Sequence, residues 1–222
     1  MPEEAESLHS VYLNTITTIA NCLEAKDVYT RGHSKRVTDY ALHLANNLSV
    51  PVEFLQRVHL SGMLHDIGKI GIPESILNKP GKLTLEEFSQ IRLHPKISIH
   101  ILSPIISDKQ VMDIIRHHHE RFDGQGYPDG QKNGAIPLGA RILGLADAFD
   151  AMTSTRPYRK AMSKEMAVSE LERNGGAQFD AGLTKTFVEL INSAPSLQYL
   201  WHFSDKIIGE GILSIEEAGK IT

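Results

Sequence analysis

Apolar residues recur every three to four positions along most of the chain, which is the pattern of helices that bury one face. Nothing convincingly alternates with the period of two that is expected of strands. The helical stretches are found at 8–23, 37–48, 52–67, 138–152 and 183–191. The chain is therefore predicted to be all-α.

The domain organisation follows from how evenly this pattern continues. No internal repeat and no Gly/Ser-rich linker divides the sequence, and the pattern weakens only beyond Pro195. We predict a helical domain over 25–195. An extra N-terminal helix within 1–24 is interpreted as a linker or a homodimerisation helix, and 196–222 as a C-terminal extension that packs on the domain.

Glycine and proline mark helix boundaries in the first half of the chain. Gly68 follows the stretch 52–67 and is expected to end that helix in a left-handed conformation. His65 and Asp66 then fall in its last turn. Pro73 is expected to be the first helical residue of a short turn that follows.

Three later helices carry capping residues at their start. Thr84 and Glu87 form a capping-box pattern, for a helix that stops at His94 because Pro95 disfavours α geometry there. The other caps are Ser107 or Asp108, for a helix running to about Glu120, and Ser163, for a helix ending at Asn174-Gly175-Gly176. Between them, 121–137 contains four glycines and two prolines without periodicity, which predicts a long loop.

Composition excludes several classes of protein. The chain has 222 residues and is 41% hydrophobic, but no stretch reaches the roughly 18 to 20 apolar residues of a membrane helix. Its N-terminus lacks the basic and then apolar start of a secretory signal, so we predict a cytoplasmic protein without a membrane partner. The net charge of −4 and the lack of an extended basic stripe argue against nucleic-acid binding. Because Cys22 is the single cysteine, any metal site must use His and carboxylate ligands.

Histidine is the unusual component of the composition. Nine of the eleven histidines lie between His33 and His119, and several of them stand beside apolar stretches. The candidate ligands are His33, the pair His65-Asp66, His94, the pair His118-His119, and Asp147. Each has a simple alternative explanation, as a solvated pair, a polar helix end or an exposed carboxylate. A shared metal cluster accounts for all of them at once and is the interpretation we prefer.

The same residues lie in long, ordered motifs. The segments 30–37, TRGHSKRV, and 64–73, LHDIGKIGIP, resemble the HD superfamily of metal-dependent phosphohydrolases. The later segment 118–128, HHERFDGQGYP, narrows the resemblance to the HD-GYP branch. The resemblance continues through 136–142, 146–152, 156–160 and 179–180, and it covers roughly 25–190.

The resemblance implies an HD-domain helical bundle with a metal site in its core. It also implies a phosphodiesterase that hydrolyses the second messenger cyclic di-GMP to linear pGpG and, in some members, to GMP, through a metal-bridging hydroxide. By position, His33, His65, Asp66 and Asp147 resemble the ligands of one metal ion, and His94, His118 and His119, with Asp66 bridging, resemble those of the other. Neighbouring residues on a helix diverge by about 100°. His118 and His119 therefore share one ion only if the helix end points between them.

Other motif positions have implied roles in catalysis and substrate binding. Lys69, together with Asp66, is expected to be catalytic, orienting the hydroxide or contacting a phosphate; the alternative is a solvated lysine. The expected substrate-binding residues are Tyr127, Arg156 and Arg159, and Asp150 is expected to orient a ligand histidine. The alternative for the two arginines is an ordinary basic loop.

Two divalent ions are expected. Some family members bind a third ion through a glutamate one helical turn before the first ligand histidine, where this chain has Tyr29. The family prefers iron or manganese, and nickel, cobalt and zinc also suit imidazole and carboxylate ligands. The resemblance further implies contacts between the loop around Tyr127 and diguanylate cyclase (GGDEF) domains.

Two alternative functions remain open at this point. The metal motifs do not show base recognition, so another cyclic dinucleotide such as cyclic GMP-AMP is an alternative substrate. A catalytically idle sensor or interaction module is the second alternative. The presence of a suitable residue at every ligand position argues against the idle module.

Overall fold

The structure is a computed structural model that describes residues 32–155 and 160–205. Five preceding residues are also described, and all five are helical: Thr15, Thr18, Ile19, Leu23 and Lys26. Most of the expected N-terminal helix, Tyr29, Arg156, Arg159 and residues 206–222 lie outside the described residues. The roles expected of Arg156 and Arg159 therefore stay predictions, as does the division of the chain at 24 and 195.

Helices dominate the described residues, as the pattern of apolar positions predicts. Within 32–155 and 160–205 the only strand-like feature is an isolated bridge between Gly175 and Phe179. The α-helices are α2 (His33–Asn47), α3 (Val52–Leu64), α4 (Glu74–Leu77), α5 (Leu85–Ile91), α6 (His94–Leu102), α7 (Lys109–His117), α8 (Leu138–Thr153), α9 (Lys164–Asn174) and α10 (Ala181–Ser193). The 3₁₀ helices are η1 (Ile67–Gly71), η2 (Asn133–Ala135) and η3 (Leu197–Leu200). No helix of the described residues has the length and apolar character needed to cross a membrane.

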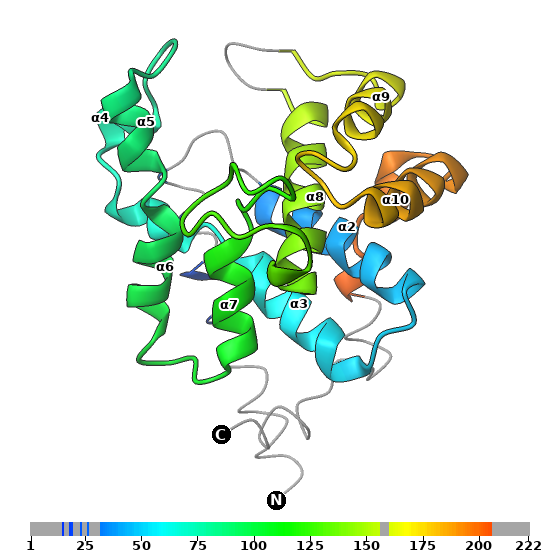
Figure 1. Ribbon diagram of the computed structural model, residues 1–222, viewed down its shortest axis with the longest axis horizontal. Helices are drawn as coiled ribbons and strands as arrows, with labels where there is room; N and C mark the ends of the chain where they lie inside the picture. Colours follow the sequence, from blue (N-terminus) through cyan, green and yellow to red (C-terminus); the bar gives the residue numbers. More distant parts are fainter. Residues whose placement is uncertain are drawn as a thin grey trace, which may run out of the picture.

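The main core forms where α2 packs on α3 and α8 (Figure 1). Tyr40, Phe149 and Phe187 are fully buried there and meet edge to face, with ring centroids 5.3 to 6.3 Å apart. Helices α9 and α10 close one side of this core, and the short α4–α5 hairpin projects away on the other side of the view. After α10, Trp201 Nε1 donates a hydrogen bond to the Tyr40 hydroxyl over 3.0 Å. The described residues near 200 therefore contact α2.

A second apolar cluster joins the N-terminal segment to the end of α3. Leu23 is 3% exposed and belongs to the cluster that contains Leu64 and Ile67. Lys26 Nζ donates hydrogen bonds to the backbone carbonyls of Ile70 and Ile72. The N-terminal segment thus touches η1, which directly follows the His65-Asp66 pair.

The end of α3 differs from the prediction. The helix stops at Leu64, so His65 and Asp66 lie in the short connection to η1 and not in its last turn. Gly68 is not in the left-handed region. A Cβ atom at Gly68 would lie 1.9 Å from the carbonyl oxygen of His94. Glycine is therefore required by a close approach between η1 and the start of α6.

The prediction for His94 was also wrong. The capping box at Thr84 and Glu87 is present, but α5 ends at Ile91, and His94 begins a new helix, α6, instead of ending the earlier one. Pro95 occupies the first turn of α6, where the missing N–H has no intrahelical partner to lose. The proline thus begins a helix in this chain.

The later elements follow the predictions more closely. Asp108 and Ser163 accept hydrogen bonds from backbone N–H groups at the starts of α7 and α9, as their cap positions predict. The loop over 121–137 is present, with only the short η2 inside it. Helix α7 ends at His117, about three residues earlier than expected, and this difference shapes the site.

Candidate metal centre

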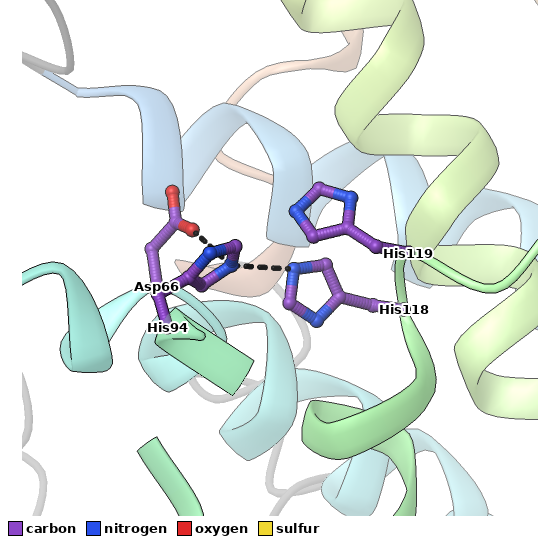
Figure 2. A group of neighbouring side chains, drawn as sticks. All are labelled: Asp66, His94, His118 and His119. Carbon is purple, nitrogen blue, oxygen red and sulfur yellow. Dashed lines mark hydrogen bonds and ion pairs between the residues drawn. The ribbon is translucent and has the colours of Figure 1, made fainter. Parts of the chain in front are cut away.

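Seven predicted side chains converge on one region from helices that are distant in the sequence. Two of them begin helices, two follow α3, two follow α7, and one lies within α8: His33, His94, His65, Asp66, His118, His119 and Asp147. The nitrogen and oxygen atoms of Asp66, His94, His118 and His119 that could bind a metal lie within 4.8 Å of one another, as do those of His33, His65 and Asp66. Figure 2 shows His118 and His119 pointing toward Asp66 and His94 across the first of these groups. Asp66 belongs to both groups.

The two carboxylate oxygens of Asp66 face different histidines. Its Oδ2 atom lies 3.4 Å from His65 Nε2 and 3.8 Å from His33 Nε2. Its Oδ1 atom lies 3.3 Å from His94 Nε2. Asp66 therefore offers one carboxylate oxygen to each of two sets of nitrogen atoms.

The early end of α7 explains how His118 and His119 point to the same place. Because the helix stops at His117, the chain turns away after His118, and the two rings come together with centroids 4.0 Å apart. The His94 ring lies 5.5 Å from that of His118 and 5.0 Å from that of His119. His118 and His119 can therefore point to one ion, as the resemblance requires.

Backbone carbonyl groups orient three of the imidazole rings. Nδ1 of His65, His94 and His118 lies 2.7 to 2.8 Å from the carbonyl oxygen of the residue three positions earlier. A carbonyl oxygen can only accept, so each Nδ1 carries the hydrogen, and in a neutral ring the Nε2 lone pair is left facing the centre.

The Nε2 atoms are arranged for a cation. His94 Nε2 and His118 Nε2 are 3.5 Å apart, so two lone pairs face each other in a buried place. His65 Nε2 is buried and has no hydrogen-bond partner. Because unpartnered buried acceptors are unfavourable, these nitrogen atoms fit a role as metal ligands.

Burial keeps the histidines of this group neutral. Burial lowers the pKa of His94 to about 3 and that of His119 to about 4, and it lowers the pKa of His118 well below its usual range. For Asp66, burial alone would raise the pKa, but Lys69 and the surrounding imidazoles outweigh it and hold the pKa well below its ordinary value. The group of His94, His118 and His119 therefore combines neutral nitrogen donors with the ionised carboxylate of Asp66, which is the state that metal binding requires.

His33 has a different environment, because it lies between carboxylates. Its Nε2 atom is 3.3 Å from Asp147 Oδ1, and its Nδ1 atom is 2.8 Å from Asp150 Oδ2. Burial alone would lower the pKa of His33, but these two carboxylates outweigh it and raise the pKa to about 9. Asp150 therefore contacts one ring nitrogen of His33 and Asp147 faces the other, while the role of Asp150 in orienting a ligand histidine stays a prediction.

Asp150 is itself held in place by an arginine that the sequence analysis did not single out. Arg36 Nε donates to Asp150 Oδ1 over 2.6 Å, and Arg36 Nη2 donates to Asp150 Oδ2 over 3.0 Å. Ser154 adds a hydrogen bond of 3.2 Å to Asp150 Oδ2. The signal in the sequence was the position of Arg36 three residues after His33, which places both on one side of α2.

The remaining predicted residues border the centre. Lys69 Nζ lies 2.6 Å from Asp66 Oδ2 and is partly exposed. The ring of Tyr127 packs beside His119, with centroids 4.9 Å apart and the planes tilted by 32°. Burial raises the pKa of the Tyr127 phenol, so this hydroxyl keeps its proton at neutral pH.

The loop that carries Tyr127 is tied to α7. His117 is 5% exposed, and its Nε2 atom lies 3.0 Å from Asp129 Oδ2. Arg116 binds both oxygens of the same carboxylate, over 2.7 and 3.0 Å. The loop therefore has a fixed anchor close to the centre.

Comparison with known families agrees with this geometry. The sequence matches the HD domain family over residues 17–183, which includes all seven converging residues. The chain belongs to the HD domain family. This family is metal-dependent, and the curated relatives are consistent with its HD-GYP branch.

Several relatives of this HD domain are cyclic dinucleotide phosphodiesterases. The 3′3′-cGAMP-specific phosphodiesterase 1 of Vibrio cholerae is 43% identical over 145 residues, which cover 65% of this chain and 34% of the relative. The cyclic di-GMP phosphodiesterase response regulator RpfG of Xanthomonas campestris is 39% identical over 170 residues, covering 75% and 44%. The cyclic di-GMP phosphodiesterase of Thermotoga maritima is 38% identical over 193 residues, covering 85% and 52%. The chain thus spans between 34% and 52% of the length of these relatives.

Solved structures share the HD domain fold. A cyclic GMP-AMP specific phosphodiesterase of V. cholerae superposes with a TM-score of 0.62 at 18% identity, covering 93% of this chain and 52% of that one. The HD domain of the L. monocytogenes phosphodiesterase PgpH gives a TM-score of 0.55 at 17% identity, covering 78% and 97%. At these identities the likeness concerns the fold.

Proposed function

We propose that this HD domain is a metal-dependent phosphodiesterase that hydrolyses cyclic di-GMP to linear pGpG, with GMP as the further product that some family members form. The observation that carries the proposal is the set of imidazole Nε2 atoms that face one another and Asp66. His94 Nε2 lies 3.5 Å from His118 Nε2 and 3.3 Å from Asp66 Oδ1, and the buried His65 Nε2 has no hydrogen-bond partner. A cation pair is the ligand that satisfies such a set. The names of the relatives support the choice of substrate.

Two groups of side chains would hold the two ions. His33, His65, Asp66 and Asp147 form the first group, and Asp66, His94, His118 and His119 form the second. Nitrogen and carboxylate oxygen donors suit iron or manganese, with nickel, cobalt and zinc as other candidates. When bound, the ions would supply Lewis-acid charge at a phosphodiester and activate water for its hydrolysis.

The protein side chains would orient the ligands and hold the substrate. Asp66 presents one oxygen to each group, and Lys69 donates to Asp66. The partly exposed Lys69 is also the proposed contact of a phosphate oxygen. Tyr127 covers His119 and offers a protonated hydroxyl. We propose that Tyr127 contacts the nucleotide, together with Arg156 and Arg159 of the basic segment that follows α8 in the sequence. The anchored loop around Tyr127 is also the proposed contact for a diguanylate cyclase domain.

Cyclic GMP-AMP is the second candidate substrate. The relative with 43% identity carries the name of a 3′3′-cGAMP-specific phosphodiesterase, so this alternative has its own support. Both substrates contain two phosphodiester groups and differ in one base.

A competition experiment tests the proposed function. Protein reconstituted with ferrous iron or manganese under anaerobic conditions is incubated with equal concentrations of cyclic di-GMP and 3′3′-cGAMP, and the products are separated by chromatography. We expect pGpG to form faster than the product of 3′3′-cGAMP. Faster cleavage of 3′3′-cGAMP would replace the proposed substrate, and tight binding of both without any product would support the idle module.

Asp150 provides a test of how the first group is oriented. Asp150→Asn is expected to weaken metal binding at His33 by about 10- to 100-fold. The group that is hydrogen-bonded to the second ring nitrogen of a ligand histidine sets the orientation and basicity of the ring, and Asp150 is that group for His33. Isothermal titration with Mn²⁺ measures this as a loss of affinity at one of two sites. Ser154→Ala removes the 3.2 Å hydrogen bond to Asp150 and the 3.1 Å hydrogen bond that Ser154 accepts from Arg36, but it leaves the Asp150 carboxylate on His33; it is the matched control and should change affinity much less. Unchanged affinity in Asp150→Asn would contradict the proposed role.

A further inference from the structure

Arg92 lies at the edge of the candidate metal centre and is neither a proposed metal ligand nor one of the substrate contacts named above. It follows the last residue of α5 and precedes the ligand candidate His94 by two positions. Its guanidinium carbon lies 4.8 Å from the centroid of the Tyr127 ring. Tyr127 in turn packs beside His119, so Arg92 is separated from the centre by a single aromatic ring.

Arg92 differs from the other arginines of the described residues. Each of the other six has a carboxylate partner within 2.9 Å: Arg36 with Asp150, Arg57 with Asp108, Arg116 with Asp129, Arg121 with Asp123, Arg141 with Asp180, and Arg173 with Glu170. Among the described residues, the contact of Arg92 is the face of Tyr127. No acid within the part of the chain that the structure describes therefore forms an ion pair with it.

The contact with Tyr127 leaves the hydrogen-bonding capacity of Arg92 unused. A cation–π contact contributes about 0.5 to 2 kcal/mol and uses the face of the aromatic ring, whereas the N–H donors lie in the guanidinium plane. A planar fork of donors matches the oxygen atoms of a phosphate. The half-buried position and the stacked ring restrict the rotamers of this long side chain, which lowers the entropy lost when it binds an anion.

We propose that Arg92 is a substrate-binding residue that holds the second phosphate of the cyclic dinucleotide, the one that is not cleaved. This inference rests on the proposed function. A cyclic dinucleotide carries two phosphodiester anions, and one of them must reach the metal centre. Lys69 is paired with Asp66 inside the candidate metal centre. Arg92 lies on the other side of the Tyr127 ring, at the border of the centre. Arg92 is thus placed to bind the phosphate that is not cleaved.

The test compares substrates that have one and two phosphates. Arg92→Ala is assayed with cyclic di-GMP and with bis(p-nitrophenyl) phosphate, a diester that lacks a second phosphate. Hydrogen bonds to charged groups contribute about 1.5 to 3 kcal/mol, so KM for cyclic di-GMP is expected to rise about 10- to 150-fold. The kcat for cyclic di-GMP and the kcat/KM for bis(p-nitrophenyl) phosphate should stay within about threefold of the wild type, because the metal centre is untouched.

Binding and a control variant complete the design. Isothermal titration of cyclic di-GMP into protein kept free of metal with chelator should show the same loss of affinity in Arg92→Ala. Arg92→Lys should lie between the wild type and Arg92→Ala, since lysine keeps the charge but not the fork. Arg173→Ala, on the exposed side of α9, removes an arginine distant from the centre and should leave every parameter unchanged.

Three outcomes would overturn the inference. Equal losses with both diesters would place Arg92 at the reacting phosphate, and no loss with either would leave it a solvated side chain. A loss with cyclic di-GMP at least tenfold larger than with 3′3′-cGAMP would mean that Arg92 reads a guanine and not a phosphate. A wild-type protein that cleaves bis(p-nitrophenyl) phosphate but neither binds nor cleaves cyclic dinucleotides would instead contradict the proposed function.

Discussion

Replacing Asp66 with asparagine is expected to lower the rate of cyclic di-GMP hydrolysis about a thousandfold or more. The substitution keeps the size of the side chain but removes the charge that faces both groups of imidazoles. Two bound cations contribute several kcal/mol to the stabilisation of a phosphoryl transition state, and losing about 4 kcal/mol corresponds to about a thousandfold in rate. The assay is product formation after anaerobic reconstitution with iron or manganese.

Asp108→Asn is the matched control for that variant. Like Asp66, which pairs with Lys69, Asp108 pairs with a basic side chain, that of Arg57. Asp108 caps the start of α7, whereas the proposed ligands His118 and His119 follow the end of this helix, and asparagine keeps the cap. Its activity should stay within about threefold of the wild type, because a partly exposed ion pair contributes little. Circular dichroism of both variants separates loss of metal from loss of fold. An Asp66→Asn protein that keeps more than a tenth of the activity would contradict the bridging role.

Replacing Gly68 with alanine is expected to destabilise the protein by about 3 kcal/mol and to weaken metal binding. The new Cβ atom would meet the carbonyl oxygen of His94 at 1.9 Å and the backbone nitrogen of Ser98 at 2.6 Å. Backbone atoms at the start of a helix cannot turn aside as a side chain can, so η1 and α6 must separate. Because η1 follows Asp66 and α6 begins with His94, the separation also pulls two proposed ligands apart.

Thermal unfolding of the metal-free protein measures the effect of Gly68→Ala. A loss of about 3 kcal/mol lowers Tm by about 6 to 12 °C for a chain of this size. Gly134→Ala is the control, since a Cβ atom there would meet nothing within 4 Å. A Tm for Gly68→Ala within about 2 °C of the wild type, with normal Mn²⁺ affinity, would contradict the account of this close approach.

The parts of the fold that could be predicted from the sequence are those that depend on local interactions. Amphipathic spacing predicted α2, α8 and α10, and the cap at Asp108 predicted the start of α7, because each signal acts within a few residues. Gly68 was misinterpreted because the reason for its presence is the backbone of His94, which is distant in sequence. Pro95 was misinterpreted because proline both ends helices and begins them.

The site could be predicted as a set of residues but not as a geometry. Motifs and burial arguments singled out the seven residues that the structure brings together, six of them in the two ligand groups and Asp147 through its contact with His33. Nothing local indicated that α7 would end at His117 and so let His118 and His119 point to one place. Arg36 and Arg92 acquire their roles from Asp150 and Tyr127, which lie on other elements. Such roles require the tertiary structure.

The metal content of the protein tests the central claim most directly. After anaerobic reconstitution with ferrous iron or Mn²⁺ and removal of loosely bound ions, elemental analysis counts the ions per chain. The shared position of Asp66 between two groups of ligands predicts two ions per chain in the wild type and a loss of both in Asp66→Asn. One ion or none in the folded wild type, or two ions retained in Asp66→Asn, would contradict the account.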